Sequence, residues 1–417
     1  MITQIPRGTK DIFGDEIIKW QYIEDKIKEI CENSNIEEIR TPVFEHTELF
    51  IRGVGETTDI VNKEMYTFID KGNRSITLRP ESTAGIARAY IENSMNNMPQ
   101  PIKLYYISAP TFRYERAQAG RQRQFHQFGV EMIGSFSPAQ DAEVISVASR
   151  LLESVGIKDI ELKINSLGCP ICRNEYNKAL KLFLKENINN LCNTCRDRYE
   201  KNPLRIIDCK NESCKNIIEN APNILNFLDD ECNNHFQTLQ KILEGMKINF
   251  VVDSKIVRGL DYYTRTVFEF VTNSIGAQGT ICGGGRYDNL IEECGGQKTG
   301  AVGFGLGMER LIMTLDSQKK DFIKSEKDIY IGSIGENGFI KSQILTYELR
   351  KQGIKAECDT IGRSVKAQMK YANKIGVKYS VIIGDTELEE DKVVIKNMKN
   401  SEIKEIKLSE IISYIKY

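Results

Sequence analysis

The pattern of apolar and polar positions divides the chain into regions with different predicted elements. Residues 1–166 mix helix-period segments such as "DEIIKWQYIEDKIKEICENS" with the strict alternation of strands. Residues 167–254 are rich in Asn, Lys and Cys and contain helical stretches such as "RNEYNKALKLFLKEN". Strand patterns with many glycines and aromatics return over residues 255–320. We expect one domain built from the first and third regions, interrupted by a helical insertion.

The last region has a different pattern. The lysine-rich segment "LDSQKKDFIKSEKD" comes before it and is typical of a solvated linker. Beyond the linker, strand and helix patterns alternate through "DIYIGSIG", "GFIKSQILTYELRKQG", "IKAECDT" and "VKYSVIIG". Residues 327–417 are therefore expected to form a small α/β domain with a largely parallel sheet.

A hairpin with an unusual charge content is predicted within "FRYERAQAGRQRQFHQFGVEMIG", residues 112–134. Side chains along its second strand alternate between two faces. The face expected to pack on the core holds His126, Phe128, Val130 and Met132. The opposite face holds Phe125, Gln127, Gly129 and Glu131. The glycine leaves a notch of the kind that marks close approach of a ligand or of backbone. One interpretation is a ligand-binding sheet face with an arginine loop that reaches for phosphate. The alternative is an edge hairpin with a solvated charged loop.

Two further segments carry polar side chains where a simple core does not need them. In "ITLRPESTAGIARAYIEN", a strand leads into a helix, and Ser or Thr at such a start is commonly a cap. A cap does not account for Glu81, which we expect to take an ammonium group. In "VRGLDYYTRTVFEF", neighbouring strand residues point to opposite faces, so a core role explains only one of Tyr262 and Tyr263.

Two glycine-dense segments, "GTICGGGRYDNL" and "GAVGFGLGMERLIMTL", follow. In the second, Gly303, Gly305 and Gly307 share one strand face and predict a flat surface for a planar base. Arg310 is expected at the start of the next helix, in reach of phosphate. The glycines match neither the P-loop nor the dinucleotide-binding fingerprint, so they do not identify a ligand by themselves.

Composition narrows the class of protein. The 417 residues have a formal net charge of −1 and a sequence pI near 6.4, which excludes a uniformly basic nucleic-acid coat. The start of the chain lacks an apolar signal region, and no segment has transmembrane length. Eleven unevenly spaced cysteines suit a reducing compartment. We expect a cytoplasmic protein without a membrane partner.

The cysteines of the insertion also have the spacing of metal ligands. A C-x2-C-x19-C-x2-C arrangement predicts a four-thiolate zinc site made of Cys169, Cys172, Cys192 and Cys195. A looser second set follows, made of Cys209, Cys214, Cys232 and His235. The alternative is that all of these are ordinary reduced thiols.

Together the segments resemble a known family. "TLRPESTA", "FRYER…GRQRQFHQFGVEMIG" and "GFGLGMER" resemble the motifs of class II aminoacyl-tRNA synthetases, and "RGLDYYTRTVFEF" and "GGGRYD" resemble the signature of their histidyl branch. "RTPVFEHTELFIRGVGETTDIVNKEMYTF" resembles the first class II motif, which builds the dimer interface in the family.

The resemblance implies an α+β fold with an antiparallel-sheet catalytic domain, a helical insertion and a C-terminal α/β anticodon-binding domain. It also implies a homodimer that ligates L-histidine to tRNA(His) through a histidyl-adenylate, with ATP as substrate, Mg²⁺, and AMP and pyrophosphate as products. Many members lack the cysteines, and the family does not need a metal at that place.

The resemblance implies roles for individual residues at the nucleotide and RNA side of the site. Arg113 corresponds to the α-phosphate ligand and, with Arg258, to a catalytic cation. The other ATP-binding residues are Glu115 for the adenine amino group and Arg121 and Arg310 for the outer phosphates. The residues facing the tRNA acceptor end are Arg116, Gln118 and Arg123.

The histidine pocket is implied in the same way. Its ammonium-binding residues are Glu81, Thr83 and Gln127. Glu131 and Tyr263 are expected to bind the two ring nitrogens, and Arg113 and Arg258 lie near the carboxylate. Tyr262 and Tyr287 are expected to line the pocket. A site that satisfies both ring nitrogens rejects analogues that lack them, so an editing domain is not required.

Two other functions share parts of these patterns. A catalytically silent paralogue in the family serves as a regulatory subunit in histidine biosynthesis, but it lacks the anticodon-binding domain and degrades "RGLDYY". Another class II synthetase shares the ATP arginines but does not explain Glu131, Tyr263 and "RGLDYY" together. ATP–pyrophosphate exchange with each amino acid separates the three functions.

Overall fold

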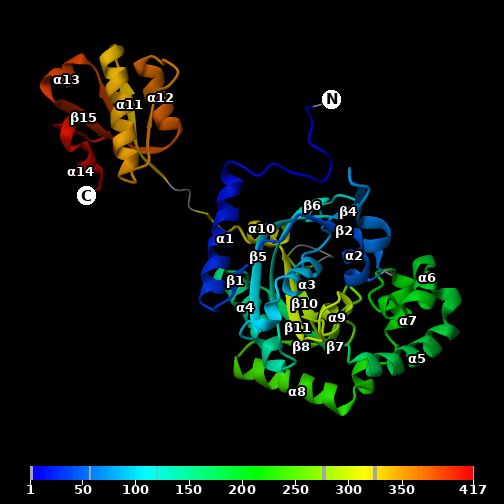
Figure 1. Ribbon diagram of the computed structural model, residues 1–417. Helices are drawn as coiled ribbons and strands as arrows, with labels where there is room; N and C mark the ends of the chain where they lie inside the picture. Colours follow the sequence, from blue (N-terminus) through cyan, green and yellow to red (C-terminus); the bar gives the residue numbers. More distant parts are fainter. Residues whose placement is uncertain (1–2, 56–57, 119, 275–278, 323–325, 417) are drawn as a thin grey trace. The chain divides into compact units, whose positions relative to one another are not determined.

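The structure is a computed structural model, and it describes residues 3–55, 58–118, 120–274, 279–322 and 326–416 (Figure 1). The chain separates into two compact units, Met1–Phe322 and Ile323–Tyr417. Each unit has its own hydrophobic core. Within the described residues, none of the helices is both long and apolar enough to cross a bilayer.

The first unit combines a large sheet with a set of helices that lie on both sides of it. Its strands are β1 (Glu37–Glu38), β2 (Phe44–His46), β3 (Tyr66–Ile69), β4 (Ser75–Leu78), β5 (Ile102–Phe112), β6 (Gln124–Ile133), β7 (Ile160–Ser166), β8 (Val251–Val252), β9 (Thr264–Thr272), β10 (Thr280–Arg286) and β11 (Ala301–Gly307). Its helices are α1 (Asp15–Glu32), α2 (Thr47–Val54), α3 (Thr83–Glu92), α4 (Pro138–Ser154), α5 (Pro170–Glu186), α6 (Asn193–Lys201), α7 (Glu212–Ile218), α8 (Asp230–Gly245), α9 (Leu290–Glu293) and α10 (Met308–Ser317).

The large sheet is mainly antiparallel, as predicted. Over the described residues its strand order is β1-β5-β6-β11-β10-β9-β7-β8. All pairs from β5 to β7 are antiparallel, and only the short edge strands β1 and β8 pair in parallel. The predicted hairpin is present as β5 and β6. A separate small sheet, β2-β4-β3, leads into helix α3.

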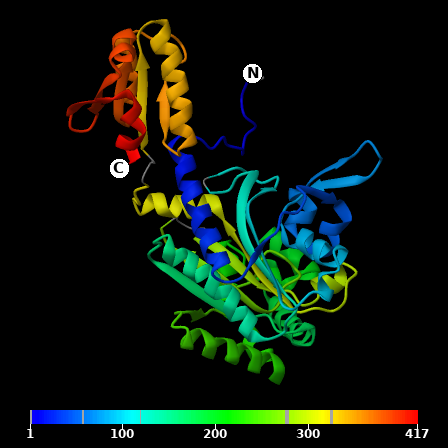
Figure 2. The same cartoon turned by 60° about the vertical axis from the view of Figure 1, so that its left-hand side comes forward.

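The predicted alternation of β6 decides which face of the large sheet is packed. Phe128, Val130 and Met132 are fully buried in a core that α1, α4, α8 and α10 complete. Figure 2 shows α1 and α4 running along the sheet. The opposite face carries Gln127 and Glu131, and it packs against α3 and the insertion helices α5–α7. The face assignment made from the sequence is confirmed.

The predicted linker is solvated only in part. Helix α10 extends to Ser317, so the segment begins inside a helix. The Lys320 ammonium lies 4.7 Å from the ring centroid of Tyr22 and donates a hydrogen bond of 3.1 Å to its hydroxyl. Phe322 packs edge-on against the same ring. The boundary between the two compact units falls within this segment, as expected of a linker, but the Lys320 side chain covers the Tyr22 ring instead of being fully solvated.

The second unit is a sheet covered by helices. Its strands are β12 (Lys327–Ser333), β13 (Ala356–Cys358), β14 (Val377–Ile383), β15 (Lys392–Asn397) and β16 (Ile403–Lys407). Its helices are α11 (Gly335–Lys351), α12 (Val365–Lys374), α13 (Asp385–Glu390) and α14 (Ile411–Lys416). The first three strands pair in parallel through helical crossovers, as predicted. Two antiparallel pairs, β14 with β15 and β15 with β16, complete the sheet.

Candidate active site

Three glycines form a trough across the site face of the large sheet. The strand register aligns Tyr106, Gly129, Gly305, Gly283 and Glu269 in one row across β5, β6, β11, β10 and β9. The end residues of the row have large side chains, and the three glycines between them have none. The site therefore begins as a depression three strands wide.

The site's own side chains fill much of this space. A Cβ on Gly129 would lie 2.2 Å from the Tyr106 hydroxyl, so the tyrosine ring occupies the notch predicted for a ligand. In the next row, a Cβ on Gly303 would lie 1.8 Å from Oε2 of Glu131. The flat surface expected at Gly303, Gly305 and Gly307 is interrupted at Gly303, because the Glu131 carboxylate lies across that glycine. At Gly305 the nearest atom to an added Cβ is Nε2 of Gln127, at 3.2 Å.

Glu131 is a buried carboxyl group held by two hydroxyl donors. It is 1% exposed. Thr83 Oγ1 donates to its Oε1 at 2.8 Å, and the Tyr287 hydroxyl donates to its Oε2 at 2.5 Å. Burial raises the pKa of Glu131 to about 8, and the two hydrogen bonds offset only part of that effect. Burial therefore favours the neutral, protonated form of this group in the ligand-free site.

This pKa makes the stability of the ligand-free chain depend on pH. A carboxyl raised above its unfolded value near 4.3 stabilises the fold fully below that pH, and the contribution is lost as pH rises to about 8. The free energy of unfolding falls by at most roughly 5 kcal/mol for a pKa that differs by this much between the folded and unfolded states. Glu131→Gln removes the ionisation, so the variant should lose less stability than wild type between pH 5 and pH 9. Chemical denaturation at both pH values measures the difference, and parallel curves for the two proteins would contradict the raised pKa.

Glu81 lies beside this group and caps helix α3. Its carboxylate accepts the backbone N–H of Thr83 at 2.7 Å and of Ala84 at 2.9 Å. Burial raises its pKa, and these two bonds counteract the rise. The prediction that a cap does not account for Glu81 is therefore wrong, because its side chain does the work expected of Ser82. Two buried carboxyl groups nevertheless meet at one helix start.

Three buried tyrosines line the space next to the carboxyl groups. The rings of Tyr262 and Tyr263 are 4.7 Å apart, and those of Tyr262 and Tyr287 are 5.5 Å apart. Both neighbours, Tyr262 and Tyr263, are only 6% exposed. The sequence argument placed Tyr262 and Tyr263 on opposite faces of a strand. It is wrong because strand β9 begins only at Thr264, and the preceding turn has no strand alternation.

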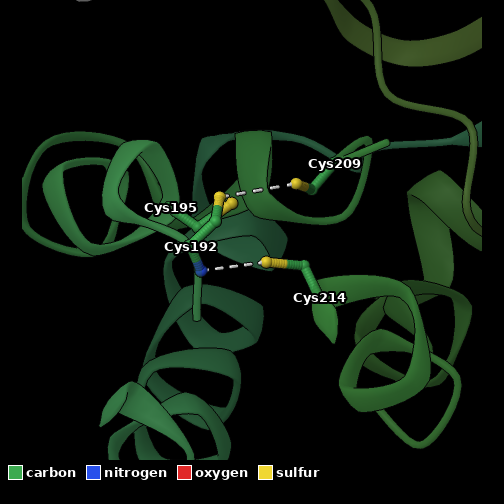
Figure 3. A group of neighbouring side chains, drawn as sticks. All are labelled: Cys192, Cys195, Cys209 and Cys214. Atoms are coloured by element: carbon green, nitrogen blue, oxygen red, sulfur yellow. Dashed lines mark hydrogen bonds between the residues drawn. The ribbon is translucent and has the colours of Figure 1, made fainter. Parts of the chain in front are cut away.

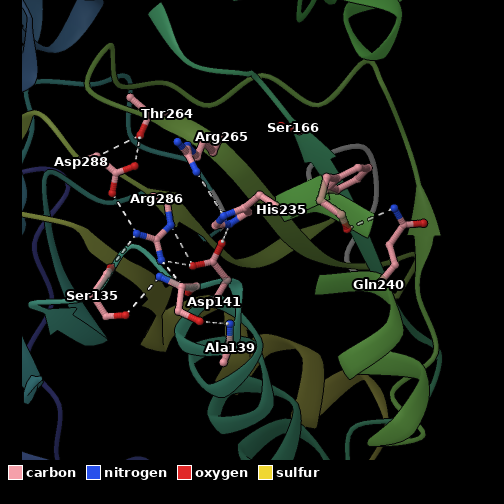
Figure 4. Close-up of polar contacts among 12 residues, drawn as sticks. Ser135, Ala139, Asp141, Ser166, His235, Gln240, Thr264, Arg265, Arg286 and Asp288 are labelled. Carbon is pink, nitrogen blue, oxygen red and sulfur yellow. Dashed lines mark hydrogen bonds and ion pairs between the residues drawn. The ribbon is translucent and has the colours of Figure 1, made fainter. Parts of the chain in front are cut away.

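A buried ionic network holds the end of β10, which Tyr287 directly follows (Figure 4). Arg286 is fully buried and pairs with Asp141 at 2.5 Å and with Asp288 at 2.9 Å. His235 bonds the second oxygen of Asp141 at 2.8 Å. Burial alone would raise the pKa of Asp141, but the Arg286 guanidinium and His235 lower it. His235 therefore belongs to this network, and its predicted place in a cysteine set is wrong.

Arg258 lies over the glycine trough. A Cβ on Gly283 would be 2.4 Å from Nη2 of Arg258, and the guanidinium pairs with Glu269 on the adjacent strand. Burial lowers the pKa of Arg258, but Glu269 and the Tyr263 hydroxyl outweigh it and raise the pKa. The Arg258 Nε–H group is buried without a hydrogen-bond partner among the described residues. Arg258 is a fixed cation with a spare donor.

Further along the face, the cationic hairpin supplies Arg113 and the loop arginines. Arg113 donates from Nε to the Pro80 carbonyl at 2.8 Å and stacks on the ring of Phe125. Arg113 faces Arg123 across the hairpin, and its backbone N–H donates to the Arg123 carbonyl at 2.9 Å. On β6, Gln127 lies opposite Ala109, and the Thr111 hydroxyl donates to its side-chain oxygen at 3.4 Å.

The loop brings two more arginines near one another. Arg121 pairs with Glu115 at 3.2 Å. Arg310, in the first turn of α10, donates to the carbonyls of Thr280 at 2.7 Å and of Gly120 at 3.4 Å. Burial, and then the charge of Arg121, lowers the pKa of Arg310. Two arginines whose charges repel make a place where an anion is stabilised.

The remaining loop residues differ in exposure. Arg123 stacks on the Tyr114 ring at 4.4 Å and donates to the Glu115 carbonyl at 3.3 Å. Arg116 and Gln118 are exposed, and backbone bonds between Gln118 and Arg121 close the tip of the loop.

The structure adds site residues that were not identified from the sequence. Tyr106 fills the glycine notch, and no sequence signal pairs it with Gly129 before the register is known. Glu269 holds Arg258, and its signal is a lone charge within the apolar strand "TVFEFVT". Arg205, from the insertion, donates to the Arg258 carbonyl at 2.6 Å.

The cysteines of the insertion form two groups, but the sequence pairing is wrong. Cys192 and Cys195 lie with Cys209 and Cys214 (Figure 3), and we call these residues the four-cysteine cluster. The mixed cluster contains Cys169, Cys172, Cys232 and Asp229. The two C-x2-C pairs separate because each begins a different helix, α5 or α6.

Comparisons with known families cover nearly the whole chain. The family described as "Histidyl-tRNA synthetase" matches residues 8–311, and "Anticodon binding domain" matches residues 329–417. A histidine–tRNA ligase of Acetivibrio thermocellus is 56% identical over 417 residues, 100% of both chains. A histidine–tRNA ligase of Clostridioides difficile is 53% identical over 100% of this chain and 99% of its own.

Solved structures agree. The apo histidyl-tRNA synthetase of S. aureus has a TM-score of 0.84 and 40% identity over 99% of this chain and 100% of its own. A protein of Bacillus halodurans described as an ATP phosphoribosyltransferase regulatory subunit/histidyl-tRNA synthetase has a TM-score of 0.66 at 20% identity, over 92% of this chain and 98% of its own. At that identity the second likeness concerns the fold alone.

Proposed function

Because this chain belongs to the histidyl-tRNA synthetase family, we propose that it ligates L-histidine to tRNA(His) with ATP, through a histidyl-adenylate. The observation that carries the proposal is the buried pocket of Glu131, Thr83 and Tyr287 beside a row of arginines. A small polar ring fits hydroxyl and carboxyl partners, and the arginines suit a triphosphate.

The chemistry consists of two group transfers. A carboxylate oxygen of histidine attacks the α-phosphorus of ATP, the bond to the β-phosphate oxygen breaks, and pyrophosphate leaves. The terminal hydroxyl of tRNA then attacks the activated carbonyl carbon, loses its proton, and AMP leaves. In the family an adenylate phosphate oxygen is the usual acceptor of that proton. Mg²⁺ enters with ATP and neutralises charge on the phosphates.

Arg258 and Arg113 are proposed to stabilise the charge that grows on the α-phosphate during the first transfer. The fixed pairing of Arg258 with Glu269 supports a preorganised cation, and its unpartnered Nε–H supports a contact with a substrate oxygen. Arg113 is oriented by the Pro80 carbonyl and by Phe125.

Histidine is proposed to bind in the pocket between α3 and the three tyrosines. Glu131 and Tyr263 bind its two ring nitrogens, and Tyr262 and Tyr287 line the ring. The residues for its ammonium group are Glu81, Thr83 and Gln127. The burial that favours a proton on Glu131 suits a neutral imidazole, which has one donor and one acceptor nitrogen.

ATP and tRNA are proposed to use the cationic hairpin. Glu115 takes the adenine amino group, and Arg121 and Arg310 take the outer phosphates. The tRNA acceptor end meets Arg116, Gln118 and Arg123. The exposure of Arg116 and Gln118 supports contact with a large partner.

The domain boundaries, the cellular location and the oligomeric state are also proposed from membership of the family. Residues 1–166 and 255–320 form the catalytic domain, 167–254 the insertion, and 327–417 the anticodon-binding domain. The second compact unit and the matched residues 329–417 support the last boundary. The enzyme is proposed to work in the cytoplasm as a homodimer.

The fold likeness to the Bacillus halodurans protein does not favour the regulatory-subunit alternative, because at 20% identity it concerns the fold alone. The full-length histidine–tRNA ligase relatives and the anticodon-binding domain match favour the catalytic function. ATP–pyrophosphate exchange tests the catalytic function directly. Histidine alone among the amino acids should support exchange, and exchange with another amino acid, or with none, would overturn the proposal.

A further inference from the structure

The four-cysteine cluster has the geometry of a tetrahedral thiolate site. Its four sulfur atoms lie within 4.8 Å of one another. The sulfurs of Cys192 and Cys209 are 3.9 Å apart. Four sulfurs at about 2.3 Å from a tetrahedral Zn²⁺ are about 3.8 Å from each other. The separation is far longer than the roughly 2.05 Å of a disulfide.

The surroundings of the cluster also suit a closed structural site. Cys195 and Cys214 are fully buried, and Leu191 and Ile206 pack around them. The backbone N–H of Cys192 donates to the Cys214 sulfur at 3.3 Å, which favours a thiolate there. Four thiols grouped in an apolar shell gain little from one another, because S–H groups are weak donors and acceptors.

The chain between the ligands leads directly to Arg258. Residues 196–208, which include most of α6, form the length of chain between Cys195 and Cys209, and we call this segment loop 196–208. Arg205 donates to the Arg258 carbonyl at 2.6 Å, and Asn202 donates to Asp261 at 2.9 Å. Loop 196–208 thus contacts the turn that carries the proposed catalytic cation through Arg205 and Asn202.

A third contact ties the loop to the rest of the first unit. Arg198 pairs with Asp59 at 3.0 Å and donates to the Arg205 carbonyl at 3.3 Å. Arg198 therefore fixes the backbone of the residue that holds the Arg258 carbonyl. Both ends of this loop are attached to the four-cysteine cluster.

We propose that the four-cysteine cluster binds one structural Zn²⁺, which fixes loop 196–208 and so positions the Arg258 turn. Zinc closes the loop by joining Cys192 and Cys195 at one end to Cys209 and Cys214 at the other. The metal is remote from the reacting atoms and acts only through the loop.

The mixed cluster provides a matched control within the same insertion. Cys169 and Cys192 are both helix N-cap residues, both half-buried, and both the first cysteine of a C-x2-C pair. In the mixed cluster, Asp229 already has a structural role, because it caps α8 through the Cys232 N–H at 2.7 Å. Cys169→Ser and Cys192→Ser are therefore the same change in two places.

Metal analysis of protein purified without chelator tests the site independently of any activity. Wild type should contain at least one equivalent of zinc per chain, and less than about a tenth of an equivalent would overturn the proposal. Cys192→Ser and Cys209→Ser should each lose about one equivalent, while Cys169→Ser should keep that equivalent. Equal losses in Cys169→Ser and Cys192→Ser with none in Cys209→Ser would mean that the pairing predicted from the sequence is the right one.

X-ray absorption of the Cys169→Ser protein gives the ligand set even if the other variants fail to fold. Four sulfurs at about 2.3 Å are expected. A first shell with oxygen or nitrogen ligands would overturn the four-thiolate assignment.

The second part of the proposal, that zinc positions the Arg258 turn through loop 196–208, rests on the proposed function and has its own test. Removing zinc from wild type with a chelator should lower kcat for histidine-dependent exchange at least tenfold, and added Zn²⁺ should restore it. KM for ATP should change much less, because the loop holds the Arg258 turn and not the phosphate arginines. Unchanged kcat in the zinc-free enzyme would overturn the positioning role and leave the metal site standing. A wild type that binds zinc but activates no amino acid would instead overturn the proposed function.

Discussion

Replacing Arg258 with alanine is expected to lower kcat for histidyl-adenylate formation by on the order of 10²–10³-fold, with a much smaller rise in KM for histidine. The charge on the α-phosphate grows only as the transition state forms. A cation already held by Glu269 stabilises that charge without reorganising. Steady-state pyrophosphate exchange over a range of histidine concentrations separates the two constants.

Three comparisons make this result specific. Arg258→Lys should recover only part of the rate, because an ammonium lacks the guanidinium fork. Glu131→Gln should chiefly raise KM for histidine. Arg258→Ala leaves Glu269 without its partner, which should lower stability. The double variant Arg258→Met/Glu269→Gln leaves no unpaired charge at this place, so its stability should approach that of wild type while kcat stays low. Near-normal kcat with a raised histidine KM in Arg258→Ala would make Arg258 a binding residue, and the catalytic cation would then be Arg113 or Mg²⁺.

Gly303→Ala is expected to reduce kcat/KM for histidine at least 100-fold. The new methyl carbon would lie 1.8 Å from the Glu131 carboxylate and 2.6 Å from the Val130 carbonyl oxygen. The backbone cannot move away inside a paired sheet, so the carboxyl group is displaced and its bonds with Thr83 and Tyr287 are lost. Overpacking of this kind also costs roughly 1–3 kcal/mol of stability. Kinetics with histidine and denaturation curves measure the two effects.

Gly307→Ala is the matched control on the same strand face. Its added carbon would approach no heavy atom closer than 3.9 Å, the distance to the Arg310 side chain. Histidine KM should stay within about twofold of wild type, since ordinary van der Waals contact displaces nothing. If Gly303→Ala binds histidine as well as Gly307→Ala does, then Glu131 does not need the space above Gly303, and its proposed role in ring recognition is wrong.

The sequence by itself determined the elements whose signal is local. Alternation along "QFHQFGVEMI" separated the core face from the site face correctly, because successive strand residues always point to opposite sides. The motif series identified the family, and the crossover pattern predicted the parallel half of the second unit. The roles of the individual site residues remain predictions.

Only the tertiary structure decided what depends on contacts between distant segments. The register placed Tyr106 over Gly129 and Glu131 over Gly303, so side chains fill part of the surface that the sequence predicted to be open. The same is true of the cysteines, since Cys209 and Cys214 complete the pair that begins at Cys192, while Cys169 turns toward Asp229. Spacing along a chain limits which residues can meet, but helix starts and strand register determine which of them do.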